Sequence, residues 1–132
     1  MERLVGRLTV QGPPEVFTGD VYADVIAKGA DPSRVRLNLV RFAPCARTAW
    51  HSHSLGQVLY VTEGVGIVAT RDRVIVIRAG DAVHTPPGEE HWHGALPTSF
   101  MSHLAMWEGD DSVWGDHVTD AEYSAAAASI GD

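Results

Sequence analysis

His51-Ser52-His53-Ser54-Leu55-Gly56-Gln57, followed by Gly64, and Gly80-x5-Pro86-x-Gly88-x2-His91-Trp92-His93 are the two stretches that decide the fold. On a β-strand, residues i and i+2 project from the same face, so each H-x-H pair places two imidazoles side by side. Imidazole binds zinc, copper, iron and nickel, and it occurs in mixed manganese sites. A small turn after His53 would return the side-chain oxygen of Gln57 to the same cavity. One H-x-H pair alone indicates packing more often than metal binding, but the joint pattern favours a metal site.

Short β-rich runs, punctuated by glycine and proline, surround these two stretches. We expect strands at residues 21–27, 34–42, 48–53, 58–62, 65–70, 73–78, 83–86, 91–95 and 99–107. We place turns at Glu63-Gly64 and Ala79-Gly80-Asp81, and a hairpin around Arg71-Asp72. The alternation slips at Leu39-Val40, which indicates either a bulge or a strand that is buried on both faces. Many short strands separated by turns predict an all-β sandwich or barrel.

The two ends of the chain differ from this β-rich centre. Gly12-Pro13-Pro14 ends a short N-terminal arm, because proline cannot donate to a sheet ladder. Thr119-Asp120-Ala121-Glu122 forms a T-x-x-E capping box, and the alanines at 125–128 favour a helix after it. The 132 residues have the size of one domain. We therefore expect a single domain over 1–132, with an arm at about 1–16, a barrel at about 17–110 and a helical tail at about 119–130.

Composition and charge exclude several classes of partner. The chain is 45% hydrophobic and 20% charged, which is the balance of a globular protein. Its formal net charge of −7 repels a phosphate backbone, so we expect no nucleic-acid binding. No apolar stretch approaches the roughly 18 residues of a membrane span, and the N-terminus lacks the apolar core of a signal peptide. A single cysteine, Cys45, permits no internal disulfide, and these features together predict a cytoplasmic protein.

The spacing of both stretches resembles the two motifs of the cupin superfamily, G-x5-H-x-H-x3,4-E-x6-G and G-x5-P-x-G-x2-H-x3-N. The match runs from about Thr48 to Ala95. It departs at three positions, where Cys45 replaces the first glycine, Gln57 replaces glutamate and Ala95 replaces asparagine. The resemblance implies a double-stranded β-helix, or jelly roll, and a homodimer. It also implies one divalent transition metal per chain, with the ligands His51, His53, Gln57 and His91.

The exchange of glutamate for Gln57 changes the charge of such a centre. Three neutral imidazoles and a neutral amide would leave a bound dication its full charge. The ion would then act as a stronger Lewis acid toward an incoming oxygen and would attract anions. Retention of the ion would be weaker than with an anionic ligand.

A second resemblance, to the bacterial cupin hydroxynitrile lyases, extends from Phe17 onward. It is carried by residues 46–51, Leu55-Gly56-Gln57, residues 87–95, His103-Leu104-Ala105 and the tail that contains residues 117–120 and Tyr123. It implies a manganese-type site that cleaves or forms cyanohydrins, with iron, zinc, nickel or cobalt as the other candidate metals. The matching pocket positions are Val40, Thr48, His93 and His103. Trp107 stands where those lyases carry a polar glutamine, and its indole would shrink the pocket.

Strand geometry, apart from the resemblance, also places His93 and His103 in this pocket. His93 lies on the same strand face as His91, so we expect it to point into the metal cavity. His103 shares a face with Met101, Ala105 and Trp107 on the last long strand, which would line the same interior. Either histidine could instead be a core residue that is satisfied by a backbone carbonyl. The Thr48 hydroxyl could orient a substrate oxygen, or the side chain could simply pack in a strand.

Three functions fit the sequence. The first is a lyase acting on a small molecule, in which the metal holds the substrate oxygen and His93 exchanges the proton, since imidazole titrates near neutral pH. The second is a metal-dependent dioxygenase, because three histidines with an open position also suit iron and O2. The third is a non-catalytic binding or sensor cupin, which would bind a ligand without turnover.

Overall fold

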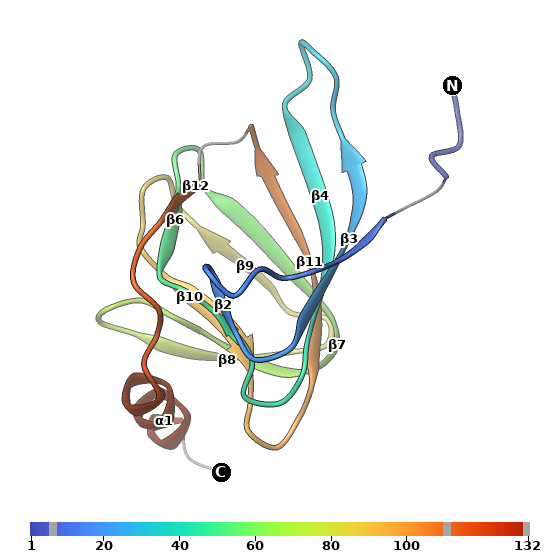
Figure 1. Ribbon diagram of the computed structural model, residues 1–132. Helices are drawn as coiled ribbons and strands as arrows, with labels where there is room; N and C mark the ends of the chain where they lie inside the picture. The colour runs from blue at the N-terminus through green and yellow to red at the C-terminus, as the bar shows by residue number, and fades with distance from the viewer. Residues whose placement is uncertain (6–7, 110–111, 131–132) are drawn as a thin grey trace.

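The structure, a computed structural model, describes residues 1–5, 8–109 and 112–130, and most of its regular secondary structure is β-strand (Figure 1). The strands are β1 Thr9–Gln11, β2 Phe17–Thr18, β3 Val21–Lys28, β4 Val35–Phe42, β5 Arg47–Thr48, β6 His51–His53, β7 Gln57–Ala69, β8 Val74–Arg78, β9 Ala82–Thr85, β10 Trp92–Ala95, β11 Met101–Glu108 and β12 Ser112–Trp114. One helix, α1 (Asp120–Ser129), follows near the C-terminus. The predicted all-β jelly roll with a short C-terminal helix is confirmed. No helix in the described ranges is long and apolar enough to cross a membrane.

The long strand β7 joins the two layers of the curled sheet. Its first half pairs with β11 and β9, and its second half pairs with β10 and β8. The predicted turn at Glu63-Gly64 is therefore wrong, because the strand bends there and continues. Gly64 has a φ of +76°, and a Cβ at this position would collide with the carbonyl oxygen of Phe100. The register also shifts opposite this point, between Ser102 and His103, so the strand changes direction without reversing.

Two other sequence predictions concern β8 and β4. Residues 65–69 of β7 pair with β8 through the hairpin around Arg71-Asp72, as expected. A bulge at Leu39-Val40 is wrong, because β4 pairs with β11 in unbroken register, and the irregularity lies on β3 between Val25 and Ala27. From residue 36 onward, β4 is buried or half-buried on both faces, which accounts for the slipped alternation.

Two hydrophobic clusters support the fold. The first fills the barrel and includes Phe42, Leu59, Val61 and Met101. The Phe42 ring lies 5.8 Å from the His93 ring and 5.3 Å from the His103 ring, so this core reaches the histidines. The second cluster lies under α1 and combines Trp50, Ile67, Trp92, Val118, Tyr123 and Ala126.

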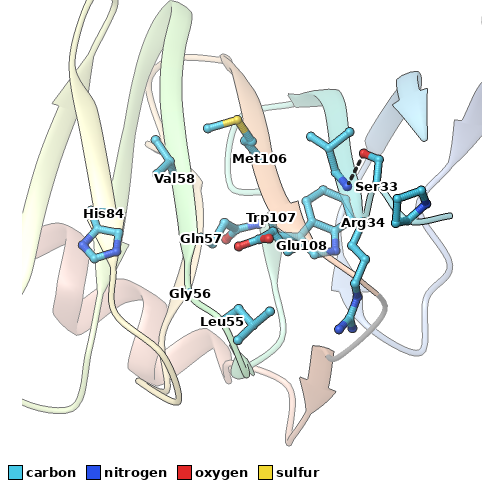
Figure 2. Close-up of a pocket in the computed structure, with 12 residues that line it drawn as sticks. Ser33, Arg34, Leu55, Gly56, Gln57, Val58, His84, Met106, Trp107 and Glu108 are labelled. Carbon is cyan, nitrogen blue, oxygen red and sulfur yellow. Dashed lines mark hydrogen bonds between the residues drawn. The ribbon is translucent and has the colours of Figure 1, made fainter. Parts of the chain in front are cut away.

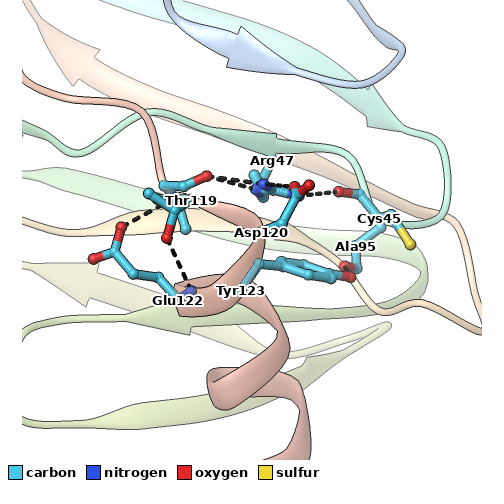
Figure 3. Close-up of polar contacts among 8 residues, drawn as sticks. Cys45, Arg47, Ala95, Thr119, Asp120, Glu122 and Tyr123 are labelled. Carbon is cyan, nitrogen blue, oxygen red and sulfur yellow. Dashed lines mark hydrogen bonds and ion pairs between the residues drawn. The ribbon is translucent and has the colours of Figure 1, made fainter.

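The C-terminal segment is tied to the barrel at several points. The predicted capping box is confirmed, since Glu122 N donates to Thr119 Oγ1 and Thr119 N donates to Glu122 Oε1, each at 3.0 Å (Figure 3). The buried Arg47 donates to Val118 O at 2.8 Å and pairs with Asp120 at 2.7 Å. Tyr123 donates to Ala95 O at 2.6 Å. Upstream of these anchors, β12 pairs with β6, which places this segment against the strand that carries His51 and His53.

Candidate metal centre

Five histidines gather in the interior of the barrel. They are His51 and His53 on β6, His91 just before β10, His93 on β10 and His103 on β11, and all five are buried. His51 and His91 form an isolated antiparallel bridge, in which each N–H donates to the other residue's carbonyl at 2.9 Å. The two rings consequently lie 4.3 Å apart. The bridge thus joins the two sequence stretches at their histidines.

The Nδ1 atoms of three rings already have partners, which orients the opposite nitrogen inward. Nδ1 of His51 lies 2.9 Å from Ala49 O, and Nδ1 of His91 lies 3.0 Å from Glu89 O. A carbonyl only accepts, so both rings carry their proton on Nδ1 and leave a lone pair on Nε2. Nδ1 of His53 lies 3.1 Å from Ser112 Oγ, and its Nε2 is buried with no hydrogen-bond partner. His51 and His91 therefore have the arrangement of metal-binding histidines, which donate their second ring N–H to a fixed acceptor.

Gln57 returns to the same place through a tight turn. Gly56 has a φ of +83° and its N–H donates to His53 O at 3.1 Å, so the chain reverses where the sequence predicted it. The buried Gln57 places Oε1 3.4 Å from His91 Nε2. The structure therefore brings all four predicted ligands together. Cys45, which replaces a motif glycine, adopts the left-handed conformation that glycine favours, with a φ of 71°.

His93 and His103 form a pair beside these residues. Nε2 of His103 lies 2.9 Å from Nδ1 of His93, while Nε2 of His93 is buried without a hydrogen-bond partner. Ring nitrogens of His51, His91 and His93 lie within 4.8 Å of one another. This group of three contains His93 and not His53, so His93 lies close enough to His51 and His91 to share an ion with them.

The donor set fits a divalent transition metal. Three buried histidines are close enough to bind one ion together, and the unpartnered Nε2 atoms of His53 and His93 leave the cluster unsatisfied without a partner. A buried polar atom without a partner is costly, and a borderline-soft cation would satisfy such nitrogens. The identity of the metal does not follow from the geometry.

Burial keeps these imidazoles neutral. Desolvation is the largest cause in every case, and it lowers the pKa of His53 and of His103 to about 4. It also lowers the pKa of His91, and it lowers those of His51 and His93 well below the ordinary value, with neighbouring imidazoles adding to the shift for His51 and His93. Neutral imidazole is the form that binds metals, so the site is ready for an ion at pH 7.

The remaining predicted residues surround the cluster. Thr48 Oγ1 donates to Ala49 O at 2.8 Å and accepts from His93 N at 3.2 Å, so it links the His51 and His93 segments. Val40 is a core residue that pairs with His103 across β4 and β11. Trp107 lies near the cluster, with its ring 6.0 Å from the His53 ring.

Trp107 and Gln57 also line an outer groove of about 530 Å³ (Figure 2). Val58, His84 and Met106 line the same groove, and none of the five clustered histidines does. Gln57 and Trp107 are therefore the residues that the groove shares with the interior site.

Sequence reasoning missed three residues that contact the histidines. Ser112 bonds His53, the Trp114 ring stacks on the His51 ring at 4.5 Å, and Phe42 packs on His93 and His103. Ser112 and Trp114 belong to β12, a strand of three residues that pairs with β6 across a long sequence separation. The only local signal was the short alternation Ser112-Val113-Trp114.

Comparison with known proteins agrees with this geometry. Residues 38–103 match a family described as the cupin domain. An (R)-mandelonitrile lyase from Granulicella tundricola is 43% identical over 127 residues, which cover 93% of this chain and 97% of that protein. A cupin-like protein from Thermotoga maritima has a TM-score of 0.87 at 31% identity, covering 99% of this chain and 100% of that one. The polyketide cyclase RemF from Streptomyces resistomycificus, with a TM-score of 0.72, 21% identity and coverage of 94% and 92%, shares the fold.

Proposed function

The chain belongs to the cupin family, and on that premise we propose that it is a metal-dependent lyase that cleaves or forms cyanohydrins. The observation that carries the proposal is the set of buried imidazoles whose Nδ1 atoms are held by Ala49, Glu89 and Ser112. The 43% identity to an (R)-mandelonitrile lyase supports the choice of reaction. The same relative supports a small molecule as the substrate.

We assign the metal to His51, His53, Gln57 and His91, with His93 beside them. This ligand set follows the cupin spacing, and we assign His93 to proton transfer instead, because its Nδ1 is bonded to the His103 imidazole, which can itself carry a proton. When bound, the metal supplies a Lewis acid that favours negative charge on the substrate oxygen. Manganese is the proposed ion, and iron, zinc, nickel and cobalt are the alternatives. Gln57 keeps the protein ligands neutral, so they do not reduce the charge of the ion.

We assign proton transfer to His93. Its unpartnered Nε2 accepts the hydroxyl proton of the cyanohydrin, and the carbon–carbon bond then breaks with its electron pair on cyanide. His93 returns the proton to cyanide, so the products are an aldehyde and hydrogen cyanide. His103 supports the ring of His93 from the other side, and Thr48 fixes the backbone of His93. The reverse sequence forms the cyanohydrin.

The experiment is aldehyde release from an aromatic cyanohydrin, followed by absorbance. Protein purified without added metal is first analysed for its elements, stripped with chelator and then reloaded with each candidate ion. We expect release only by the loaded protein, and most with manganese. Absence of activity in loaded wild-type protein and in loaded Trp107→Gln would remove the lyase assignment.

The same samples address the two other functions. A three-histidine site also suits iron and O2, so O2 consumption by the iron-loaded protein would indicate a dioxygenase. Ligand binding without turnover by any loaded form would indicate a binding cupin.

We also propose that the protein is a cytoplasmic homodimer. The support is the resemblance to other cupins and the single cysteine, which suits a reducing compartment. Light scattering during size-exclusion chromatography tests the dimer, and a monomer mass would contradict it.

A further inference from the structure

Arg71 lies at the tip of the β7–β8 hairpin, outside both metal-binding stretches, yet it contacts a neighbour of a ligand in each. Its guanidinium carbon lies 3.6 Å from the centroid of the Trp50 ring. Its Nε and Nη2 atoms lie 2.8 Å and 2.7 Å from Glu90 Oε1. Trp50 directly precedes His51, and Glu90 directly precedes His91.

These contacts meet at the bridge that assembles the site. His51 and His91 exchange both main-chain hydrogen bonds at 2.9 Å, so a single guanidinium holds the residue before each bridge partner. The carbonyls that orient the two rings, Ala49 O and Glu89 O, lie on the same two segments. A shift of either segment would therefore move a ligand together with the acceptor that sets its tautomer. We propose that Arg71 is a positioning residue that fixes the His51–His91 pair for metal binding, a role that rests on the proposed metal site.

An exposed ion pair alone would not carry this role. Arg71 and Glu90 are about half exposed, with side chains at 56% and 47% of full accessibility, and such pairs contribute little. Trp50, in contrast, is buried in the cluster under α1, so the guanidinium stacks on a rigid ring. Glu122 of α1 lies 3.8 Å from Arg71 Nη1 on the helix side. Arginine suits this position because its planar fork can stack and bind a carboxylate at once, whereas lysine cannot.

The direction of the change in metal affinity on removing Arg71 distinguishes a positioning role from a purely electrostatic one. Removing a cation near the site should, by electrostatics alone, leave dication binding unchanged or slightly tighter. If Arg71 positions the ligands, removing it should weaken binding instead. Arg73 is an exposed arginine on the same hairpin, and Arg73→Ala therefore provides a control with the same change of charge.

The test measures Mn²⁺ affinity by titration of the free-ion electron paramagnetic resonance signal, together with the visible spectrum of the Co²⁺-loaded protein. We expect roughly tenfold weaker Mn²⁺ binding and an altered Co²⁺ spectrum in Arg71→Ala, as for other residues that support metal ligands. Arg71→Lys should lie between Arg71→Ala and the wild type, and Arg73→Ala should match the wild type. Melting temperatures of the metal-free proteins are recorded in parallel.

Wild-type affinity and spectrum in Arg71→Ala, even with a lower melting temperature, would overturn the proposal and leave a structural role. Equal weakening in Arg73→Ala would overturn it as well. A wild-type protein that binds no Mn²⁺ or Co²⁺ would remove both this inference and the metal site. A wild type that binds metal without lyase activity would contradict only the proposed reaction, and the Arg71 result would stand.

Discussion

Two kinds of histidine lie together in the interior of the barrel, and they differ in the group that binds the ring nitrogen Nδ1. His51 and His91 give Nδ1 to main-chain carbonyls at 2.9 Å and 3.0 Å, whereas His93 and His103 bond each other at 2.9 Å. A carbonyl cannot donate, so the first two rings have a fixed tautomer and an inward lone pair. An imidazole can donate or accept, so the second pair can relocate a proton. The partner of each ring, rather than its burial, separates His51 and His91 from the proposed proton carrier His93.

The difference arises within two residues of a single segment. His91 and His93 project from the same face, yet His91 Nδ1 faces the Glu89 carbonyl and His93 Nδ1 faces β11. The loop before β10 supplies the first partner and a neighbouring region of the barrel supplies the second. Replacing a histidine held by a carbonyl and replacing a member of the His93–His103 pair should therefore have different effects on metal binding and turnover.

Removal of a carbonyl-held histidine should have the largest effect. In His91→Ala, we expect metal affinity to fall by more than about 100-fold, beyond the loss caused by changing a residue that only supports a ligand. Turnover should fall to the level of the metal-free protein. Elemental analysis and aldehyde release measure both quantities, and normal metal content in this variant would remove His91 from the ligand set.

Removal of His103, the partner of His93, should have a smaller effect that is confined to turnover. His103→Phe retains a ring against Phe42 but leaves His93 Nδ1 without its partner. We expect metal content to stay at the wild-type level and kcat to fall by roughly tenfold or more, part of the ~10²–10⁴-fold that acid–base groups contribute. Unchanged kcat would mean that His103 only fills the core.

Acid should destabilise the metal-free protein through protonation of His103. Burial lowers the pKa of His103 from its ordinary value of 6.5 to about 4, so the unfolded chain binds a proton first as the pH falls. The stability from neutral His103 is complete above pH 6.5 and is lost between about 6.5 and 4. By pH 4.5 this loss amounts to about 2–3 kcal/mol. Urea unfolding at pH 7 and 4.5 should show His103→Phe losing less stability than the wild type, and equal losses would contradict this assignment.

Replacing Trp107 should have the smallest effect. It should change the substrate range and leave metal binding and proton transfer intact. Its indole lies near His53 and lines the outer groove beside Gln57. We expect Trp107→Gln to raise kcat/KM for an aromatic cyanohydrin by up to roughly tenfold, the size of a steric effect in a pocket. A small aliphatic cyanohydrin is the control and should change less. A loss of activity toward both substrates would show that the indole supports the site.

Much of the site could be predicted because its information is local. The spacing of His51 and His53 on one strand, the turn at Gly56 and the position of Gln57 all follow from short-range geometry. The hairpin around Arg71-Asp72 and the capping box at Thr119 have the same local character, and both are present.

Features that depend on distant pairing could not be predicted. Glu63-Gly64 reads as a turn, and only pairing with β11, β10 and β8 shows that β7 continues through it. Ser112 reaches His53 through a strand pairing across 59 residues. Arg71 contacts Trp50 and Glu90 because the hairpin folds back over the second core, which no local pattern reveals.

The separation of the proposed metal ligands from the proposed proton carrier is tested most directly by metal content and turnover in His53→Ala and His93→Ala, measured side by side. Both variants remove one buried imidazole whose Nε2 has no hydrogen-bond partner. We predict that His53→Ala loses the metal, whereas His93→Ala keeps about one ion per chain, as the wild type does, and loses turnover. Full occupancy in His53→Ala, with loss of the metal in His93→Ala, would contradict the account, because the ligands would then be His51, His91 and His93.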